Sequence, residues 1–549
     1  TYHWDLQGNL LTVTNALAQT TTYGDHNGLG QPQTVTDIND IVTRLEYHSR
    51  GWLEKVTVEA PGLDRSKDAV TSYLWYPNGL LEQITSPDGG YLHYEYNDAR
   101  HLTEIQNNLG ESITFTPNEV GDWTLAETKD VSSNIKRQQQ RAFDELGRLM
   151  DVFGNDSQHT HYQYDTNNNL ASIEKYGDRT LTTTMHYDAL DRLQEVIKPI
   201  QHLVNGSITP TDIKTLYSYD SSDSVNSVTD PEANSTTYWS NGFGERIRVD
   251  SPDTDTTDYW YDAQGNLSDQ RDARGVLIKY HYDLLGRLEH IEYPANSAEE
   301  VRFYYDEVSI ENPYAKGRLT RMTDPSGSTL YIYDHRGNQI SKQQIVQDEI
   351  YNFQYAFNLA DNLIQMTYPS GRLVSYERND ILGRISSVTM LAPGEATSTT
   401  LISDIQYTPF GAITQYTYGN GLTRSVPLDL DYRVGSIAVA DGSIERINMS
   451  YEYDGFNNIK TITNVLDSSR SQSFIYDDLQ RLQDAYGTYG NGTDHVHYEY
   501  DKVGNRKIRA LYQAGAAHTS ETYTYFPNSN QLDTVIETQG AQTRSRQFT

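Results

Sequence analysis

One short phrase recurs from end to end of the chain, and it limits the fold more than any other feature. It reads Tyr-x-Tyr-Asp-x-x-Gly-Asn/Arg. Clear copies are "TYHWDLQGNLLTV" at the start, "IKYHYDLLGRLEHI" at Ile278 to Ile291, "MSYEYDGFNNIKTI" at Met449 to Ile462 and "HVHYEYDKVGNRKI" at His495 to Ile508. Anchored on the last aromatic residue before the turn, about 23 copies follow one another, one per roughly 24 residues. A repeated phrase of this kind predicts a repeated structural unit.

Each copy predicts one β-hairpin. Tyr498 and Tyr500 lie two residues apart with Glu499 between them, so on a strand the two rings share one face. Asp501 follows and favours the first position of a turn, because its carboxylate accepts backbone N–H bonds. Gly504 supplies the positive φ that closes a hairpin of three to five residues, and Gly286 has the same place in its own copy.

The hairpins predict an all-β fold in one domain over residues 1–549. The clearest anchors are Trp4, Tyr47, Tyr96, Phe143, Tyr164, Tyr187, Tyr219, Tyr261, Tyr282, Tyr305, Tyr333, Tyr453, Tyr476 and Tyr500, with weaker ones such as Tyr76 and Thr116 between them. Turns such as "SPDGG" at Ser86 to Gly90 join one copy to the next. The result is an antiparallel meander of roughly 46 strands, which must coil into a spiral, hollow shell or tube because open sheets rarely exceed about ten strands.

Composition agrees with a packed but polar array. Mean hydropathy is −0.69, yet the chain has 43 tyrosines against 12 phenylalanines, so rings can form the buried layer and stack across strands. The net charge of −32 argues against nucleic acid as a partner. The chain has no cysteine, so disulfides and thiolate metal sites are excluded. We expect no transmembrane segment, because no apolar run of about 18 residues occurs.

The repeated Y-x-Y-D-x-x-G-R/N-L phrase, with D-P-x-G turns between copies, resembles the Rhs or YD-repeat family. That family includes bacterial polymorphic toxins, the C component of Tc toxins, wall-associated proteins and teneurins. The resemblance implies a β-sheet strip wound into a hollow shell. In the toxins such a shell encloses a C-terminal toxic domain until delivery. In wall proteins and teneurins it is an extracellular scaffold.

The resemblance implies a function as well as a fold. We expect a shell or scaffold of an exported bacterial toxin, secreted or at the cell surface, with a C-terminal effector domain or a delivery-system component as partner. The alternative is a surface adhesion or carbohydrate-binding scaffold that contacts glycans, and a polysaccharide-degrading enzyme ranks below both. The family's D-P-x-G-L cleavage region has no counterpart before "QTRSRQFT", so the chain is interpreted as the repeat core of a longer protein and no cleavage aspartates are assigned.

Sequence motifs give no catalytic, cofactor-binding or metal-binding residues. The chain lacks a phosphate-binding loop, an H-E-x-x-H zinc helix and a G-x-S-x-G nucleophile elbow. Asp253, Asp255 and Asp258 could hold calcium, but their spacing fits a solvated acidic turn better. Histidines that alternate with aromatic residues are interpreted as cross-strand hydrogen-bonding groups: His93, His161, His186 and His281. We therefore predict a chain without enzymatic activity or cofactors.

Three inserts lengthen the repeat, at 198–215, 307–317 and 390–404. Loops on a rigid scaffold often carry binding residues, but insertions in surface loops also cost little. The aromatic stretches "DYWYD" (Asp258 to Asp262) and "YLWYPNG" (Tyr73 to Gly79) could stack on sugar rings, although packing within the sheet is the simpler use.

Overall fold

A computed structural model describes residues 1–204, 207–378, 382–489 and 492–548. These residues form 47 strands in a single sheet, from β1 (Tyr2–Trp4) to β47 (Gln542–Gln547). Every strand pairs antiparallel with the next one in the chain, as β1 with β2 (Leu10–Thr14) and β46 (Leu532–Gln539) with β47. The described helical structure consists of three short 3-10 turns at Arg65–Lys67, Ser297–Glu299 and Ser468–Arg470. The predicted all-β meander is therefore confirmed.

The turn after each anchor has a constant geometry, illustrated by the turn between β25 (Leu277–Tyr282) and β26 (Leu288–Glu292). Asp283 Oδ1 accepts hydrogen bonds from the N–H groups of Leu285 and Arg287, at 2.8 and 2.9 Å. Gly286 donates to the Asp283 carbonyl and has φ +76°. This is a three-residue hairpin loop with a left-handed third residue, and the pairing register shifts beside it at Tyr282.

The last residues of the phrase bind the anchor of the next repeat. The Arg287 guanidinium donates to Asp283 Oδ2 and lies 4.3 Å over the ring centroid of Tyr305. The Tyr305 hydroxyl donates to the carbonyl of Leu288 at 3.0 Å. The same hydroxyl–carbonyl bond recurs at 2.7–3.0 Å along the chain, and its pairs include Tyr164–Leu149, Tyr187–Leu170, Tyr219–Leu193, Tyr282–Leu267, Tyr333–Leu319, Tyr453–Val434, Tyr476–Ile459 and Tyr500–Leu482. Each repeat is thus fastened to the one before it.

The anchors differ from the sequence prediction in two ways. Tyrosine rings meet each other in places, as at Tyr76 and Tyr96, but the contact that recurs is arginine over tyrosine rather than ring on ring. In the hairpin of β7 (Ala69–Trp75) and β8 (Leu81–Thr85), Trp75 holds the anchor position instead of Tyr76, because its indole N–H donates to Leu53 O at 2.7 Å. Tyr76 begins the turn, at the position where other copies have aspartate. The anchor therefore lies one residue before the position predicted from the aromatic spacing.

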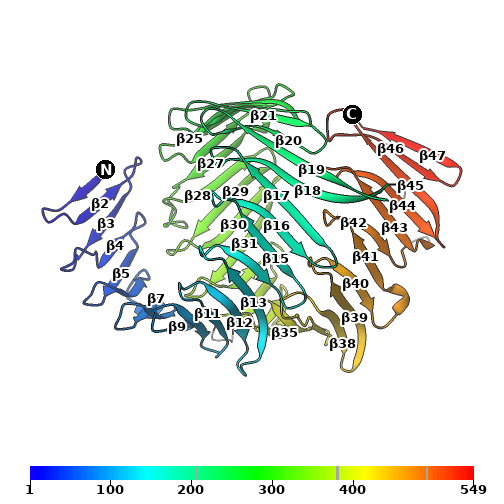
Figure 1. The fold of residues 1–549 in the computed structure, drawn as a ribbon. Helices are drawn as coiled ribbons and strands as arrows, with labels where there is room; N and C mark the ends of the chain where they lie inside the picture. Colours follow the sequence, from blue (N-terminus) through cyan, green and yellow to red (C-terminus); the bar gives the residue numbers. More distant parts are fainter. Residues whose placement is uncertain (205–206, 379–381, 490–491, 549) are drawn as a thin grey trace.

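The sheet winds round in an open spiral (Figure 1), and segments far apart in sequence come into contact. Gln138 of β13 (Ile135–Phe143), for example, donates its backbone N–H to the carbonyl of Leu430 at 3.0 Å. The two termini are at opposite sides of the view, and the sheet does not close on itself. Side-chain contacts between successive windings join residues 270–300 positions apart. One winding therefore takes about a dozen repeats.

The sheet is one layer thick and has little apolar core. Its accessible surface is 31127 Å², whereas a compact monomer of this mass exposes about 20,000 Å². The largest fully buried side chain is an amide, that of Asn107, whose nitrogen donates to Glu111 at 2.8 Å. Buried apolar residues are small and scattered, so hydrogen bonds and half-buried rings hold the sheet together rather than a central core.

The conformation of the turns gives a first testable prediction. Gly504 has φ +106°, and the nearest atom to its Cβ position is Arg481 Nη1 at 4.0 Å, so replacement by Val costs mainly left-handed backbone strain, about 1–2 kcal/mol. Asn168 and Asn457 hold the same turn position at φ +72° and +68°, so Gly504→Asn is the matched control with a smaller loss. Urea unfolding measures both. Equal stability of the Val and Asn variants would contradict the turn assignment.

The hydroxyl–carbonyl bond gives a second prediction. Tyr282→Phe removes the donor to Leu267 O and leaves the ring, so this hairpin should lose about 0.5–1.5 kcal/mol. Native-state hydrogen exchange reads this local loss at the amides of β24 (Leu267–Arg271) and β25. Tyr351→Phe, at a tyrosine that is 43% exposed, is the control. If both variants changed exchange equally, the hydroxyl would not fasten the repeats.

Candidate functional site

Among the described residues, parts of the chain that are far apart in sequence meet where successive windings touch, a contact that we call the seam. The turns that follow the anchors form one edge of the sheet, the Tyr–Asp edge, and the turns between repeats form the other, the inter-repeat edge. In the seam the inter-repeat edge of the first winding meets the Tyr–Asp edge of the second. The side chain of Asn39 binds the backbone of Lys316 in both directions at 3.0 Å, and Arg433 pairs with Asp156 at 3.1 Å.

The seam also explains the acidic turn that the sequence marked. Asp253 accepts hydrogen bonds from the backbone and side chain of Asn530 and from the Ser529 hydroxyl. Asp258 is paired with Arg248 and Arg271 at 2.6 and 2.9 Å, while Asp255 is exposed. The predicted solvated turn is therefore wrong for Asp253, because a contact 277 residues away in sequence occupies its carboxylate.

The three inserts have different structures. Residues 307–317 lie in the seam, with Ala315 fully buried and Asn312 bonded to the backbone of Tyr331 and Tyr333. Residues 198–215 extend one long hairpin, β18 (Leu193–Val204) and β19 (Ser207–Tyr219), whose tip at 205–206 lies outside the described residues. Within the insert at 390–404, residues 392–398 form a mostly exposed loop between β34 (Ser387–Leu391) and β35 (Thr399–Tyr407), and the other residues belong to these two strands. One of the three thus has a structural role that its sequence does not show.

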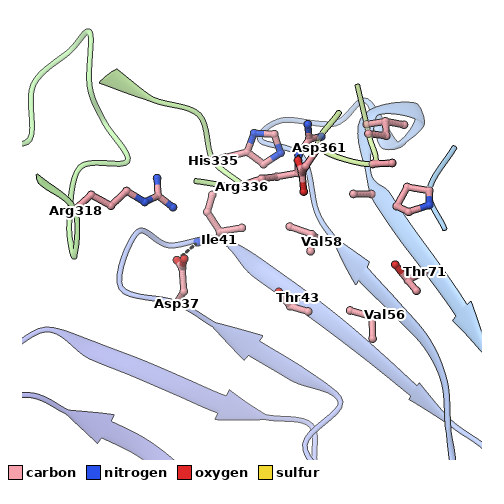
Figure 2. A pocket seen from close by; sticks show the side chains of 14 residues that line it. Asp37, Ile41, Thr43, Val56, Val58, Thr71, Arg318, His335, Arg336 and Asp361 are labelled. Carbon is pink, nitrogen blue, oxygen red and sulfur yellow. Dashed lines mark hydrogen bonds and ion pairs between the residues drawn. The ribbon is translucent and has the colours of Figure 1, made fainter. Parts of the chain in front are cut away.

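A cavity of about 460 Å³ opens in the seam (Figure 2). Ile41 and Val58 line it from the first winding, and His335, Arg336 and Asp361 from the second. Arg336 Nε donates to Asp361 at 2.8 Å and its Nη2 to a backbone carbonyl, so this cation is engaged in holding the loop. Burial lowers the pKa of His335, which keeps it neutral. The cavity wall thus mixes apolar side chains with charges that are already paired.

A second cavity, of about 330 Å³, is lined by aromatic side chains. Trp52 stacks on His48 with ring centroids 5.0 Å apart, and Trp75 lies 6.0 Å from Trp52. Trp75 belongs to the aromatic stretch that the sequence marked for sugar stacking, although its indole N–H is used by the anchor bond. Glu54 and Glu82 complete the wall with polar groups.

Three clusters of histidine and carboxylate side chains occur among the described residues. Each brings its ligand-type atoms within 4.8 Å of one another: Asp151, His159 and His161; His281, His290 and Glu292; Asp484, His495 and His497. The cross-strand hydrogen bonds predicted for His161, His186 and His281 are present, at 2.8, 2.9 and 2.8 Å from their carboxylates. His93, for which the same bond was predicted, instead lies 3.5 Å from Glu95 of its own strand, β9 (Tyr91–Tyr96). Sequence reasoning weighed these histidines one by one and missed that some converge on a shared carboxylate.

Several turn aspartates have a lowered pKa because of the bonds that shape the turns. The N–H of Arg148 lowers the pKa of Asp144, the Arg192 side chain lowers that of Asp188, and the Asn266 side chain lowers that of Asp262. Between repeats, the Asn134 side chain is the main cause that lowers the pKa of Asp130 to about 2. In these four turns the bonds that form the turn favour the ionised carboxylate.

Comparisons with known proteins fit this architecture. Residues 123–307 match the family model described as the Teneurin YD-shell, and residues 314–344 match the RHS Repeat. The resemblance to Rhs/YD-repeat proteins is thereby confirmed. A comparison with curated proteins finds no match. No helix of the described residues is long and apolar enough to cross a membrane.

Solved structures show the same fold over the entire chain. A crystal structure of TcdB2-TccC3 matches with a TM-score of 0.78 and 15% identity, covering 100% of this chain and 36% of that one. A second crystal structure, of TcdB2-TccC3-TEV, matches with a TM-score of 0.79 and 14% identity, covering 97% of this chain and 35% of that one. A structure of the Tc holotoxin pore from Photorhabdus luminescens matches with a TM-score of 0.78 and 13% identity. The match covers 100% of this chain and 38% of that one. The chain spans little more than a third of these structures and has the fold of their Rhs shell.

The lowered pKa values give a third prediction. A carboxylate whose pKa is lower in the folded chain stabilises the fold above its unfolded pKa of about 3.9, and this stabilisation is lost as the pH falls through the folded value. We expect the melting temperature to fall between about pH 4 and pH 2. Asp262→Asn keeps the turn acceptor but cannot titrate, so it should lose less on acidification. A melting temperature that stays constant in this range would contradict the role of the turn carboxylates.

Proposed function

We propose that this chain forms part of the wall of a YD-repeat shell that encloses or presents an effector domain of an exported bacterial toxin. The observation that carries the proposal is the seam. It shows a wall built by stacking one winding of a single-layer sheet on the previous one, with polar contacts such as Asn39–Lys316 and Arg433–Asp156 along the joint. The shared fold with structures of TcdB2-TccC3 supports a role in a toxin assembly.

The free Tyr–Asp edge of the first winding supports a larger wall. On this edge, the residue two positions after the Asp or Asn that begins each turn is often apolar. In the second winding, where the seam covers it, this residue is half-buried, as in Ala360, Phe456, Leu479 and Val503. In the first winding it is 64–92% exposed, as in Leu29, Val120, Leu146, Leu190 and Phe243. The free edge thus repeats a surface that elsewhere in the chain is covered by another winding.

The surface charge and the open sheet fit the same proposal. A net charge of −32 opposes non-specific association of a chain with this much exposed surface. An enclosed effector would cover one face of the sheet, which is one layer thick and has little apolar core of its own. The chain itself then acts passively, without catalysis, as a secreted or surface component whose partners are the effector and a delivery protein.

The test uses a preparation that contains the effector domain, in the same chain or as a separate one. Enclosure predicts that a protease leaves the effector intact while the seam is closed. The double variant Asp253→Ala/Asn530→Ala removes a cluster of seam bonds and should speed cleavage of the effector. Asp255→Ala, in the same turn but exposed, is the matched control. Equal cleavage in the wild-type protein and the seam variant would overturn the proposal.

The radius of gyration, measured by small-angle scattering, distinguishes an incorrect fold from a correct fold that does not enclose the effector. A compact protein of 549 residues has a radius of gyration of about 24 Å, and an open spiral should exceed it clearly. If the radius is large but the effector is not protected, the fold stands and the enclosing role fails.

A carbohydrate-binding scaffold is the second candidate, and the aromatic cavity at Trp52 and Trp75 is the observation that favours it. Binding on a glycan array that is lost in Trp52→Ala but retained in Tyr351→Ala would favour that role. An enzyme built on the array remains the third candidate, and turnover that depends on one carboxylate would favour it.

A further inference from the structure

The two clusters that contain a His-x-His pair are copies of one arrangement. The first, the Asp151 site, comes from "LMDVFGN" and "HTHYQYD", and the second, the Asp484 site, comes from "LQDAYGT" and "HVHYEYD". In both, a carboxylate on one strand faces two histidines on the next strand, with an aromatic residue two positions after the carboxylate. The two copies lie 336 residues apart, counted between His159 and His495.

The Asp151 site joins β14 (Leu149–Phe153) to β15 (His159–Tyr164). Asp151 and His161 are direct cross-strand partners. Asp151 Oδ1 lies 2.7 Å from His159 Nε2 and 2.8 Å from His161 Nδ1. The His159 ring is stacked between Phe153 and Tyr176, at centroid distances of 4.4 and 4.6 Å.

The Asp484 site joins β42 (Leu482–Tyr486) to β43 (His495–Tyr500) with the same register. Asp484 Oδ1 lies 2.7 Å from His495 Nε2 and 2.7 Å from His497 Nδ1. The His495 ring is stacked between Tyr486 and Tyr512, at 4.3 and 4.7 Å. The same nitrogen of each imidazole points at the carboxylate in both sites, and the two flanking rings enclose the first imidazole of each pair.

The repeat does not require this arrangement. At the corresponding cross-strand positions, other hairpins hold Ser172 with Thr184, Ser227 with Thr237, or Asp269 with Lys279. The hydrogen-bonded ladder and the Tyr–Asp turn are complete in those repeats. The recurrence of one carboxylate, two imidazoles and two flanking rings therefore needs a reason other than folding of the hairpin.

We propose that the Asp151 site and the Asp484 site each bind one divalent transition-metal ion, with Zn²⁺ as the best match. Two imidazole nitrogens and one carboxylate oxygen are ligands that Zn²⁺ takes in proteins, and a site with three protein ligands leaves one position for water or a partner's side chain. The histidine side chains are 21–29% exposed, so an ion can enter from solvent. Binding needs both facing nitrogens unprotonated, so any proton there moves to the other ring nitrogen or to solvent.

The third cluster is a useful contrast. His281 Nε2 lies 2.8 Å from Glu292 Oε2, but the His281 side chain is 48% exposed. His290 Nε2 is already 3.0 Å from Glu300, and its ring is stacked on His281 instead of being enclosed between two aromatic rings. We therefore expect two ions per chain and no third one.

The test is the metal stoichiometry of the whole purified chain. After removal of metals with a chelator, the protein is titrated with Zn²⁺ by calorimetry and with Co²⁺ by visible absorption, which reports tetrahedral coordination. We expect two ions per wild-type chain, one in His161→Gln, one in His497→Gln and none in the double variant. His290→Gln is the matched control and should keep two. Circular dichroism verifies that each variant is folded.

Stability gives a second readout, because an ion that binds only the folded chain raises its melting temperature. Zn²⁺ should raise the melting temperature of the wild-type protein and of His290→Gln, and leave that of the double variant unchanged. Wild-type protein that binds no ion, or a stoichiometry that neither single variant lowers, would overturn the proposal. In that case the sites would be hydrogen-bonded triads only.

Discussion

The hydrogen bond from each anchor tyrosine to the carbonyl of the previous repeat is the interaction on which the rest of the structure depends. A sheet one layer thick cannot bury its strands against a second layer, so each hairpin must be fixed to its neighbour by local contacts. The repeated phrase supplies all of them. The aspartate shapes the turn, the arginine bridges that aspartate and the next ring, as Arg287 does at Tyr305, and the following leucine offers the carbonyl.

This arrangement explains why so polar a chain folds. Tyrosine removes ring area from water and still satisfies its hydroxyl, so it can pack in a half-buried layer where phenylalanine would leave the carbonyl unbonded. Each contribution is small, and stability accumulates along the array as in other repeat proteins. Buried amides such as Asn107 then replace the large apolar side chains of a compact domain.

The seam turns a strip into a wall. Its contacts join polar turns, as between Asp253 and Asn530, instead of apolar faces, so two edges of one sheet can stack without a core between them. The same turn residues are exposed on the free edge and half-buried in the seam, which makes the wall extendable in principle by a further edge of the same kind. A wall that is thin, curved and strongly anionic fits the enclosing role proposed above.

The sequence by itself determined the hairpin, the positive φ at Gly286 and Gly504, and the single coiled meander, because these depend on residues within one repeat. It misplaced the anchor at Trp75, where a ring replaces the turn aspartate. Only the tertiary structure decided that Asp253 lies in the seam and that His159 and His161 converge on Asp151. For the seam, the physical reason is distance along the chain. The curvature of the sheet accumulates over many strands, so contacts between residues 270–300 positions apart leave no local sequence pattern. For the histidine clusters, the reason is the strand register, which alone places a carboxylate opposite a pair of histidines.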